Sequence, residues 1–174
     1  MLSNCDLPMP GHVLICRPPG SGKTLLATVA AKTIQEKVEI LAHVVNVCCS
    51  RLTSEKHSNI RQALSGYISE ALDHAPSVVI FDDLDSLISS SPNPEVQQQS
   101  LYSVGLAQFL LDIMDEYEEK QGRMCGIGPI AFIATAQSLT NVPQTLSSSG
   151  RFDCHVKLPA PAAAERAALL KHEF

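Results

Sequence analysis

Residues 12–30 read HVLICRPPGSGKTLLATVA, and this stretch decides the fold. A short apolar run of strand character, His12–Cys16, leads into a glycine-rich turn, and a helical pattern follows over residues 23–37. Within the turn, Arg17–Thr24 (RPPGSGKT) matches the phosphate-loop pattern G-x-x-x-x-G-K-[ST] except at its first position. A strand, a loop and a helix in this order predict an α/β domain whose loop holds the phosphates of a nucleotide.

The loop predicts a role for each of its residues. Backbone N–H groups around Gly20 and Gly22 are expected to turn towards one anion, and the helix that begins near Lys23 adds its positive end. Lys23 is expected to reach the β- and γ-phosphates of ATP, and Thr24 to bind Mg²⁺ through its hydroxyl. The alternative is a glycine-rich turn with a surface lysine. The residues expected to bind the nucleotide are Pro19, Gly20, Ser21, Gly22, Lys23, Thr24 and Leu25.

The first glycine of the pattern is replaced by Arg17. If that backbone position has a positive φ, a side chain there costs about 1 kcal/mol or more. The sequence therefore predicts weaker nucleotide binding, and in the extreme a scaffold that binds no nucleotide.

A second motif lies at Ser77–Asp83 (SVVIFDD), where a buried strand pattern ends in two acids. In a parallel sheet this places both carboxylates at the carboxyl edge, beside the phosphate loop. Asp82 is expected to hold Mg²⁺ together with Thr24, and Asp83 to orient and activate the attacking water. The alternative is that these acids cap the next helix, a role open to Asp85.

The rest of the chain alternates strand and helix patterns, which predicts a five-stranded parallel sheet sandwiched between helices, in one domain over residues 1–174. Polar residues 89–99 and 120–128 are expected to form loops. The expected strands are His12–Cys16, His43–Val47, Ser77–Phe81, Ile130–Ala134 and His155–Leu158, and the expected helices cover residues 23–37, 59–74, 101–118 and a stretch that begins near Ala162.

Composition narrows the function classes. The 13 Lys and Arg residues face 18 Asp and Glu, a formal charge of -5, which disfavours general nucleic-acid binding. No apolar run approaches the roughly 18 residues of a membrane span. The six cysteines form no CxxC pair, so zinc is not expected, and the thiols are interpreted as small apolar core residues of a reduced compartment.

A third motif, Gly150–Asp153 (GRFD), follows a strand pattern. The three motifs in this order resemble the AAA ATPases and cover nearly all of the chain. The resemblance implies the large α/β subdomain of a ring-forming ATPase that uses ATP and Mg²⁺, with a helical lid expected after residue 174. Gln137 stands where these ATPases carry an Asn that helps to place the water. Arg151 matches an arginine finger that reaches the γ-phosphate of a neighbouring subunit. The expected catalytic residues are Asp83, Gln137 and Arg151.

Departures from the family at Asp83, Gln137 and Ser148 imply ATP binding with weak or no hydrolysis. Asp83 replaces the usual Glu, and withdrawing a carboxylate by roughly 1 Å can cost about a hundredfold in rate. Ser148 replaces a second arginine finger, a group worth about a thousandfold or more. Residues 48–61 (CCSRLTSEKHSNIR) lack the aromatic residue and glycine with which translocating members of the family grip polypeptide, so this domain is not expected to pull substrate itself. A competent motor ATPase and a small-molecule P-loop kinase stay open as alternatives.

Within the family, residues 74–91 (HAPSVVIFDDLDSLISSS) and 143–153 (PQTLSSSGRFD) resemble the first, degenerate ATPase domain of the peroxin-1 family, most closely its plant forms. This resemblance implies a heterohexameric ring with the second peroxisomal AAA ATPase, peroxin-6. Such a ring extracts ubiquitinated import receptors from the peroxisomal membrane. The implied location is cytoplasmic, with membrane contact through partners only.

Overall fold

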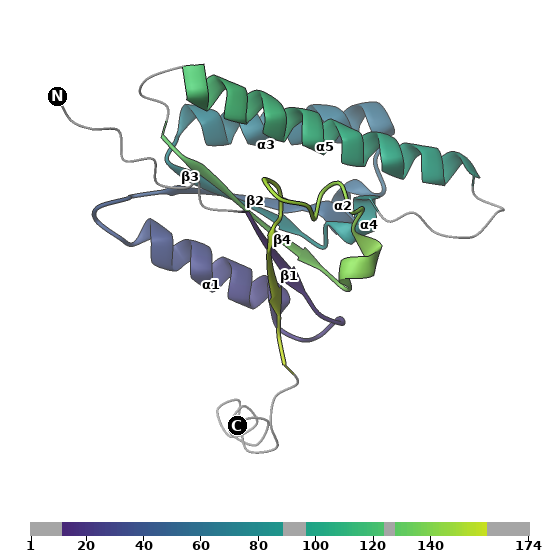
Figure 1. Cartoon of the computed structure of the whole chain (residues 1–174), viewed down its shortest axis with the longest axis horizontal. Helices are drawn as coiled ribbons and strands as arrows, with labels where there is room; N and C mark the ends of the chain where they lie inside the picture. Colours follow the sequence, from purple (N-terminus) through teal and green to yellow (C-terminus); the bar gives the residue numbers. More distant parts are fainter. Residues whose placement is uncertain (1–11, 89–96, 124–127, 160–174) are drawn as a thin grey trace.

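The computed structural model describes residues 12–88, 97–123 and 128–159 (Figure 1). Its strands form one parallel sheet of five strands in the order β2-β3-β4-β1-β5, which confirms the predicted fold class. The elements in chain order are β1 (Val13–Cys16), α1 (Lys23–Gln35), β2 (His43–Cys48), α2 (Cys49–Leu52), α3 (His57–Asp73), β3 (Ser77–Asp82), α4 (Asp85–Ile88), α5 (Gln97–Arg123), β4 (Ile130–Ala136), the 3-10 turn η2 (Leu139–Asn141) and β5 (Cys154–Lys157).

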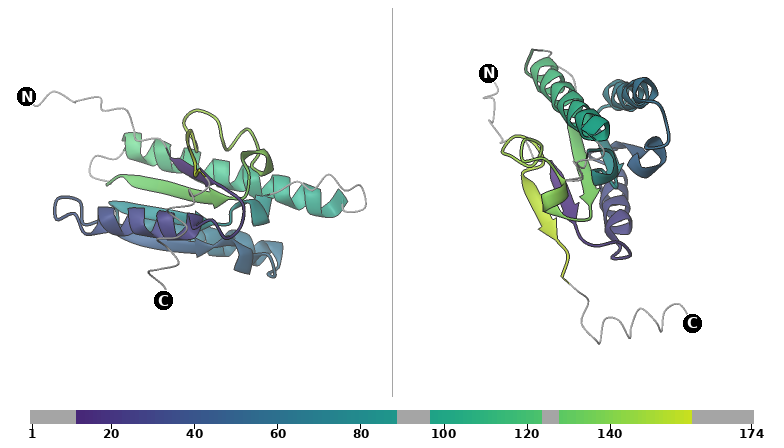
Figure 2. Two further views of the ribbon diagram at one scale, coloured as in Figure 1. Left: turned by 90° about the horizontal axis from the view of Figure 1, so that it is seen from below. Right: turned by 90° about the vertical axis from the view of Figure 1, so that its right-hand side faces the viewer.

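Helices cover both faces of the sheet. The helix α1 lies on one face, and α3 and α5 lie side by side on the other (Figures 1 and 2). Successive side chains of β3 point to opposite faces of the sheet, so they pack alternately into the two helical layers. Val79 and Phe81 belong to the apolar cluster under α3 and α5, whereas Val78 and Ile80 join Ala27 of α1. In the described ranges, no helix is long and apolar enough to cross a membrane.

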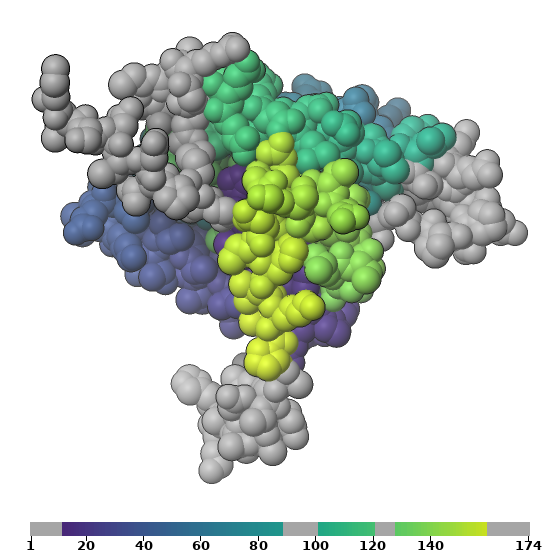
Figure 3. All heavy atoms as spheres, in the orientation of Figure 1, coloured from purple at the N-terminus to yellow at the C-terminus, as the bar shows by residue number. Residues whose placement is uncertain are grey.

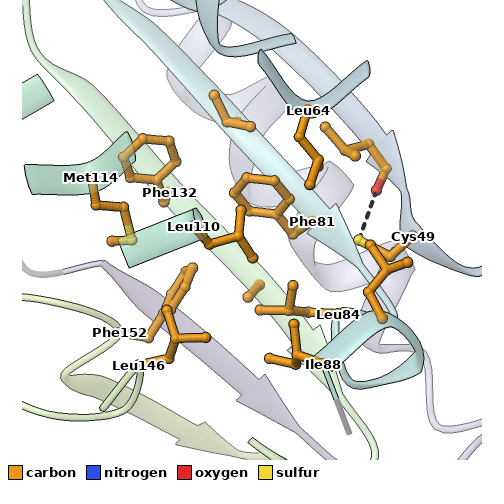
Figure 4. Packing of buried hydrophobic residues seen from close by; sticks show 14 of the residues in the cluster. Cys49, Leu64, Phe81, Leu84, Ile88, Leu110, Met114, Phe132, Leu146 and Phe152 are labelled. Carbon is orange, nitrogen blue, oxygen red and sulfur yellow. Dashed lines mark hydrogen bonds between the residues drawn. The ribbon is translucent and has the colours of Figure 1, made fainter. Parts of the chain in front are cut away.

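The larger core ties α5 to the sheet. Leu110 and Met114 of α5 and Phe132 of β4 belong to one buried cluster, drawn in Figure 4. One turn further along α5, Tyr117 is 1% exposed and packs edge-on against the ring of Phe132. The Tyr117 hydroxyl accepts a 2.6 Å hydrogen bond from the backbone N–H of Ile130, the first residue of β4. This bond satisfies a buried donor at the start of the strand that leads to Gln137.

Several predicted boundaries were wrong. The helix predicted over 101–118 is α5, which covers Gln97–Arg123, so the loops predicted at 97–99 and 120–123 are helical there. Gln, Glu and Lys are good helix formers, so helix propensity favours this longer span. The short helix α2 was not predicted. The predicted helix near Ala162 and the predicted loops at 89–96 and 124–127 lie outside the described residues.

The four described cysteines are all free thiols. Cys16 and Cys49 are buried as predicted, and burial raises the pKa of the Cys49 thiol. Cys154 is exposed and Cys48 is half-buried, so the prediction of a core role was wrong for Cys154.

The Tyr117 hydrogen bond gives a first prediction. Tyr117→Phe leaves the Ile130 N–H buried without its acceptor, so we expect the free energy of unfolding to fall by about 1–3 kcal/mol in urea denaturation. Tyr102→Phe is the matched control, because Tyr102 is 47% exposed and should change stability little. Equal stabilities of the Tyr117 variant and the parent would show that this hydroxyl is not needed at the start of β4.

Candidate functional site

The sheet order gathers the glycine-rich loop, the two acids and Gln137 at one edge. The strands β3, β4 and β1 are consecutive neighbours in the sheet and run parallel. The glycine-rich loop follows β1, Asp82 ends β3 with Asp83 directly after it, and Gln137 follows β4. Because parallel strands end at the same edge, residues far apart in the sequence meet there, as the motif spacing predicted.

The loop has the backbone that a phosphate cradle needs. Gly20 and Gly22 have φ angles of 75° and 83°, in the left-handed region that favours glycine. Arg17 has no positive φ, and its N–H donates a 3.1 Å hydrogen bond to the carbonyl of Ala136. The strain expected at Arg17 is therefore absent, because this residue continues the pairing of β1 with β4 before the chain turns.

The groups around the loop fit a phosphate. Gly22 is the N-cap of α1 and provides no side-chain acceptor for the first N–H groups of the helix. The Ser21 hydroxyl oxygen is buried and has no hydrogen-bond partner among the described residues. Lys23 is only 6% exposed. Unpaired donors, a helix N-terminus and a buried cation together suit a phosphate group. Of the other predicted loop residues, Pro19 and Leu25 are exposed.

A hydroxyl and a carboxylate form the predicted magnesium site. The Thr24 hydroxyl donates a 2.7 Å hydrogen bond to Oδ1 of Asp82, which links the start of α1 to the end of β3. Since the hydroxyl proton points at the carboxylate, the oxygen lone pairs of Thr24 stay free for a cation. Oxygen ligands of this kind are what Mg²⁺ prefers. Thr24, Thr28 and Asp82 also line a pocket of about 300 Å³.

Sequence reasoning missed Thr135, a fully buried residue of β4. Its hydroxyl donates to Asp82 Oδ1 at 2.8 Å and accepts from the Asp83 N–H at 2.8 Å. Its carbonyl accepts from the Leu84 N–H at 2.9 Å. Asp83 itself has a φ of 53°, so a non-glycine residue is held in the left-handed region. No pattern marked Thr135, because a threonine within IAFIATA is an ordinary strand residue.

Burial raises the pKa of the Asp83 carboxyl, and the neighbouring charge of Asp82 raises it further. Asp85 contributes in the same direction, and Lys23 opposes the rise. Asp83 therefore keeps its proton to a higher pH than an exposed aspartate does.

Asp85 has a different role from the helix cap considered above. It is 3% exposed, and its Oδ2 accepts hydrogen bonds from the backbone N–H of Gln137 at 2.9 Å and from the Asn141 amide at 3.1 Å. Its Oδ1 has no partner among the described residues. Asp85 thus fastens the end of β4 and the η2 turn to the acidic segment. The Gln137 side chain is exposed at the same edge.

Arg151 lies at the opposite edge of the sheet, before β5 begins. Its guanidinium forms ion pairs with Asp115 and with Glu118 of α5, the latter at 3.1 Å, and its side chain is 17% exposed. The segment from η2 to β5 forms a band beside α5 on the face seen in Figure 3. Arg151 is therefore separated from the phosphate loop of its own chain, and its role towards a neighbouring subunit stays a prediction.

A parallel α/β sheet with a glycine-rich phosphate loop and an acidic strand end defines a P-loop nucleotide-binding domain. The chain belongs to the AAA family, since the family model "ATPase family associated with various cellular activities (AAA)" matches residues 13–160.

Known relatives place this chain among several kinds of AAA protein. It is 32% identical over 165 residues to the human peroxisomal ATPase PEX1, covering 92% of this chain and 12% of that protein. It is 28% identical over 162 residues to the cell division cycle protein 48 homolog of Archaeoglobus fulgidus, covering 93% and 20%. A zinc metalloprotease, FtsH of Malacoplasma penetrans, is 29% identical over 163 residues, covering 94% and 18%. The chain thus spans a small part of each relative.

The raised pKa of Asp83 predicts a pH-dependent gain from Asp83→Asn in the metal-free protein. Above the ordinary value of 3.8, the unfolded chain loses this proton before the folded chain does, which lowers the stability of the parent. The Asn variant escapes this loss. We therefore expect its advantage in thermal unfolding to grow as the pH rises from 3.8 and to level off above the raised pKa. An advantage that is the same at every pH would contradict the raised pKa.

The Arg151 ion pairs predict a modest structural role. Arg151→Met keeps the apolar stem and removes the charge, and we expect the free energy of unfolding to fall by about 1 kcal/mol or less, because both carboxylates are about half exposed. Raising the salt concentration should shrink the difference between variant and parent. The double variant Asp115→Asn with Glu118→Gln should show the same salt-sensitive loss. An Arg151 variant as stable as the parent at low salt would show that α5 does not hold this side chain.

Proposed function

We propose that this chain is an ATP-binding module of a AAA ring, in which bound nucleotide supports assembly and hydrolysis is weak or absent. The Thr24–Asp82 hydrogen bond beside a loop of unpaired donors carries this proposal. Lys23 would neutralise the β- and γ-phosphates, and Thr24 with Asp82 would hold Mg²⁺. When bound, Mg²⁺ would offset the charge of the phosphates.

Weak hydrolysis is supported by the groups beyond this cradle. Asp83 has a shorter side chain than glutamate, and its backbone is held in the left-handed region. The one arginine in the GRFD motif, Arg151, is engaged with two carboxylates of its own chain. As proposed catalytic groups, Asp83 and Gln137 would act on the water in this site, whereas Arg151 would act in the site of a neighbouring subunit.

The peroxisomal role is supported by the human PEX1 relative, which is 32% identical over 92% of this chain. On this basis the ring partner is peroxin-6, the indirect substrate is a ubiquitinated import receptor, and the chain works at the cytoplasmic side of the peroxisomal membrane. The placement as the first, degenerate ATPase domain and the plant-like form belong to the same proposal. Relatives of nearly equal identity, such as the Archaeoglobus protein at 28%, favour a second candidate, a hydrolysing motor domain of another remodelling complex.

Nucleotide binding tests the first part of this proposal. In the intact protein, Lys23→Ala should weaken the binding of a fluorescent ATP analogue with Mg²⁺ by about tenfold or more, since it removes a charge-assisted contact. Lys32→Ala is the matched control, because Lys32 lies exposed at the far end of α1 and should change nothing. Binding that is equal in both variants and the parent would exclude the loop as the nucleotide site.

Assembly and turnover separate the two candidate functions. With peroxin-6 present, the parent should enter a heteromeric ring on addition of Mg²⁺–ATP, as mass photometry would record, and Lys23→Ala should not. If Asp83→Asn left receptor extraction unchanged while abolishing a large ATP turnover measured at this site, the assembly role would stand and weak hydrolysis would be refuted.

A further inference from the structure

We infer that Thr135 is a positioning residue of the magnesium site, one that sets which oxygen of Asp82 faces the metal and holds Asp83 beside it. This inference rests on the proposed nucleotide site. It starts from a convergence of hydrogen bonds at one carboxylate oxygen: the hydroxyls of Thr24 and Thr135 both donate to Oδ1 of Asp82, at 2.7 and 2.8 Å.

Two donors on Oδ1 fix the rotation of the carboxylate. Among the described residues, no hydrogen bond goes to Oδ2 of Asp82, so this oxygen is left to face a cation or its bound water. With only the Thr24 hydroxyl as donor, the carboxylate could turn about its terminal bond, a torsion with a broad preference. The second donor comes from β4, a different element from the helix α1 that carries Thr24. Through Thr135, the sheet itself determines which oxygen of Asp82 is left to face the metal.

A hydroxyl is the group that this position needs. Thr135 Oγ1 donates its single proton to Asp82 and accepts from the backbone N–H of Asp83. A side chain that only donates, or only accepts, could serve one of these two partners but not both. Thr135 is 0% exposed, so water has no ready access to replace the hydroxyl if it is lost.

The bond to Asp83 also explains how that residue keeps an unusual backbone. A φ of 53° is uncommon for a residue other than glycine and persists where surrounding contacts enforce it. The Thr135 hydroxyl and carbonyl bind the N–H groups of Asp83 and Leu84, two consecutive residues of the turn. The turn that aims the Asp83 carboxylate is therefore held from β4 by a single residue.

Loss of the Thr135 hydroxyl should affect the binding of Mg²⁺ and not the binding of the phosphates. Neither the phosphate loop nor the N-terminus of α1 makes a hydrogen bond to the Thr135 side chain. Removing the hydroxyl should therefore weaken Mg²⁺ binding while leaving the attraction between the loop and the phosphates intact. A residue that merely fills the core would lower stability and affect both kinds of binding alike.

The experiment compares Thr135→Val, which keeps the shape and removes the hydroxyl, with Thr135→Ser, which keeps the hydroxyl and removes the methyl group. Binding of a fluorescent ATP analogue to the intact protein is measured in EDTA and across a Mg²⁺ titration. For Thr135→Val we expect unchanged affinity in EDTA and about a tenfold higher Mg²⁺ concentration at half-effect, as for loss of one hydrogen bond to a charged group. Thr135→Ser should match the parent.

Two controls keep the outcomes distinct. Thr33→Val removes an exposed hydroxyl that bonds to the Val29 carbonyl within α1, and it should match the parent throughout. A Thr135→Val variant with the Mg²⁺ dependence of the parent overturns the inference, and so does a Thr135→Ser variant with a tenfold higher requirement. If the valine variant fails to fold, Thr135→Ala against Thr135→Ser makes the same comparison. A parent that binds no nucleotide at all refutes the proposed function instead.

Discussion

Asp82 has to meet a hydroxyl from a helix and a hydroxyl from a strand at the same oxygen, and this junction depends on the register of β3 against β4. Phe81 of β3 pairs with Ala134 of β4, so the next residues along the two strands, Asp82 and Thr135, come side by side. A slip of one residue would turn every side chain of β3 to the other face of the sheet. The groups of the proposed magnesium site therefore come together only when the core fixes this register.

The core fixes the register of β3 against β4, because the side chains on the two faces of the sheet differ in size and shape. Phe81 packs with Phe132 in the layer under α3 and α5, their rings 6.1 Å apart, whereas Ile80 lies in the layer under α1 with Ile133. Large aromatic side chains pack on one face, and β-branched side chains pack against Ala27 on the other. If the two sets changed faces, both layers would be packed less well. The packing of buried side chains in the middle of the sheet thus fixes which groups meet at the carboxyl ends of β3 and β4.

The sequence predicts the parts of this molecule that are local or periodic. The phosphate loop follows from eight consecutive residues, and the five strands follow from short runs rich in Val, Ile and Phe. Thr135 could not be found in this way, because its partners lie 52 and 53 residues away and its function comes from pairing across strands. The bond of Asp85 to Asn141 is of the same kind. The strain considered at Arg17 is absent for a related reason. The backbone of Arg17 is held by its hydrogen bond to Ala136 of β4, which the sequence alone does not reveal.

If the proposed ring forms, Arg151 would face two demands, one from its own chain and one from a neighbouring subunit. Within one chain the Arg151 side chain is only 17% exposed, and its guanidinium pairs with two carboxylates that are about half exposed. Ion pairs with such carboxylates contribute roughly 1 kcal/mol or less each, because water and salt screen them. A nucleoside triphosphate carries more negative charge than either carboxylate, so a neighbouring subunit that presents one can compete for this guanidinium. In the proposed ring, such competition would reduce the energy gained from contact with the neighbouring nucleotide by the energy of the ion pairs that are broken.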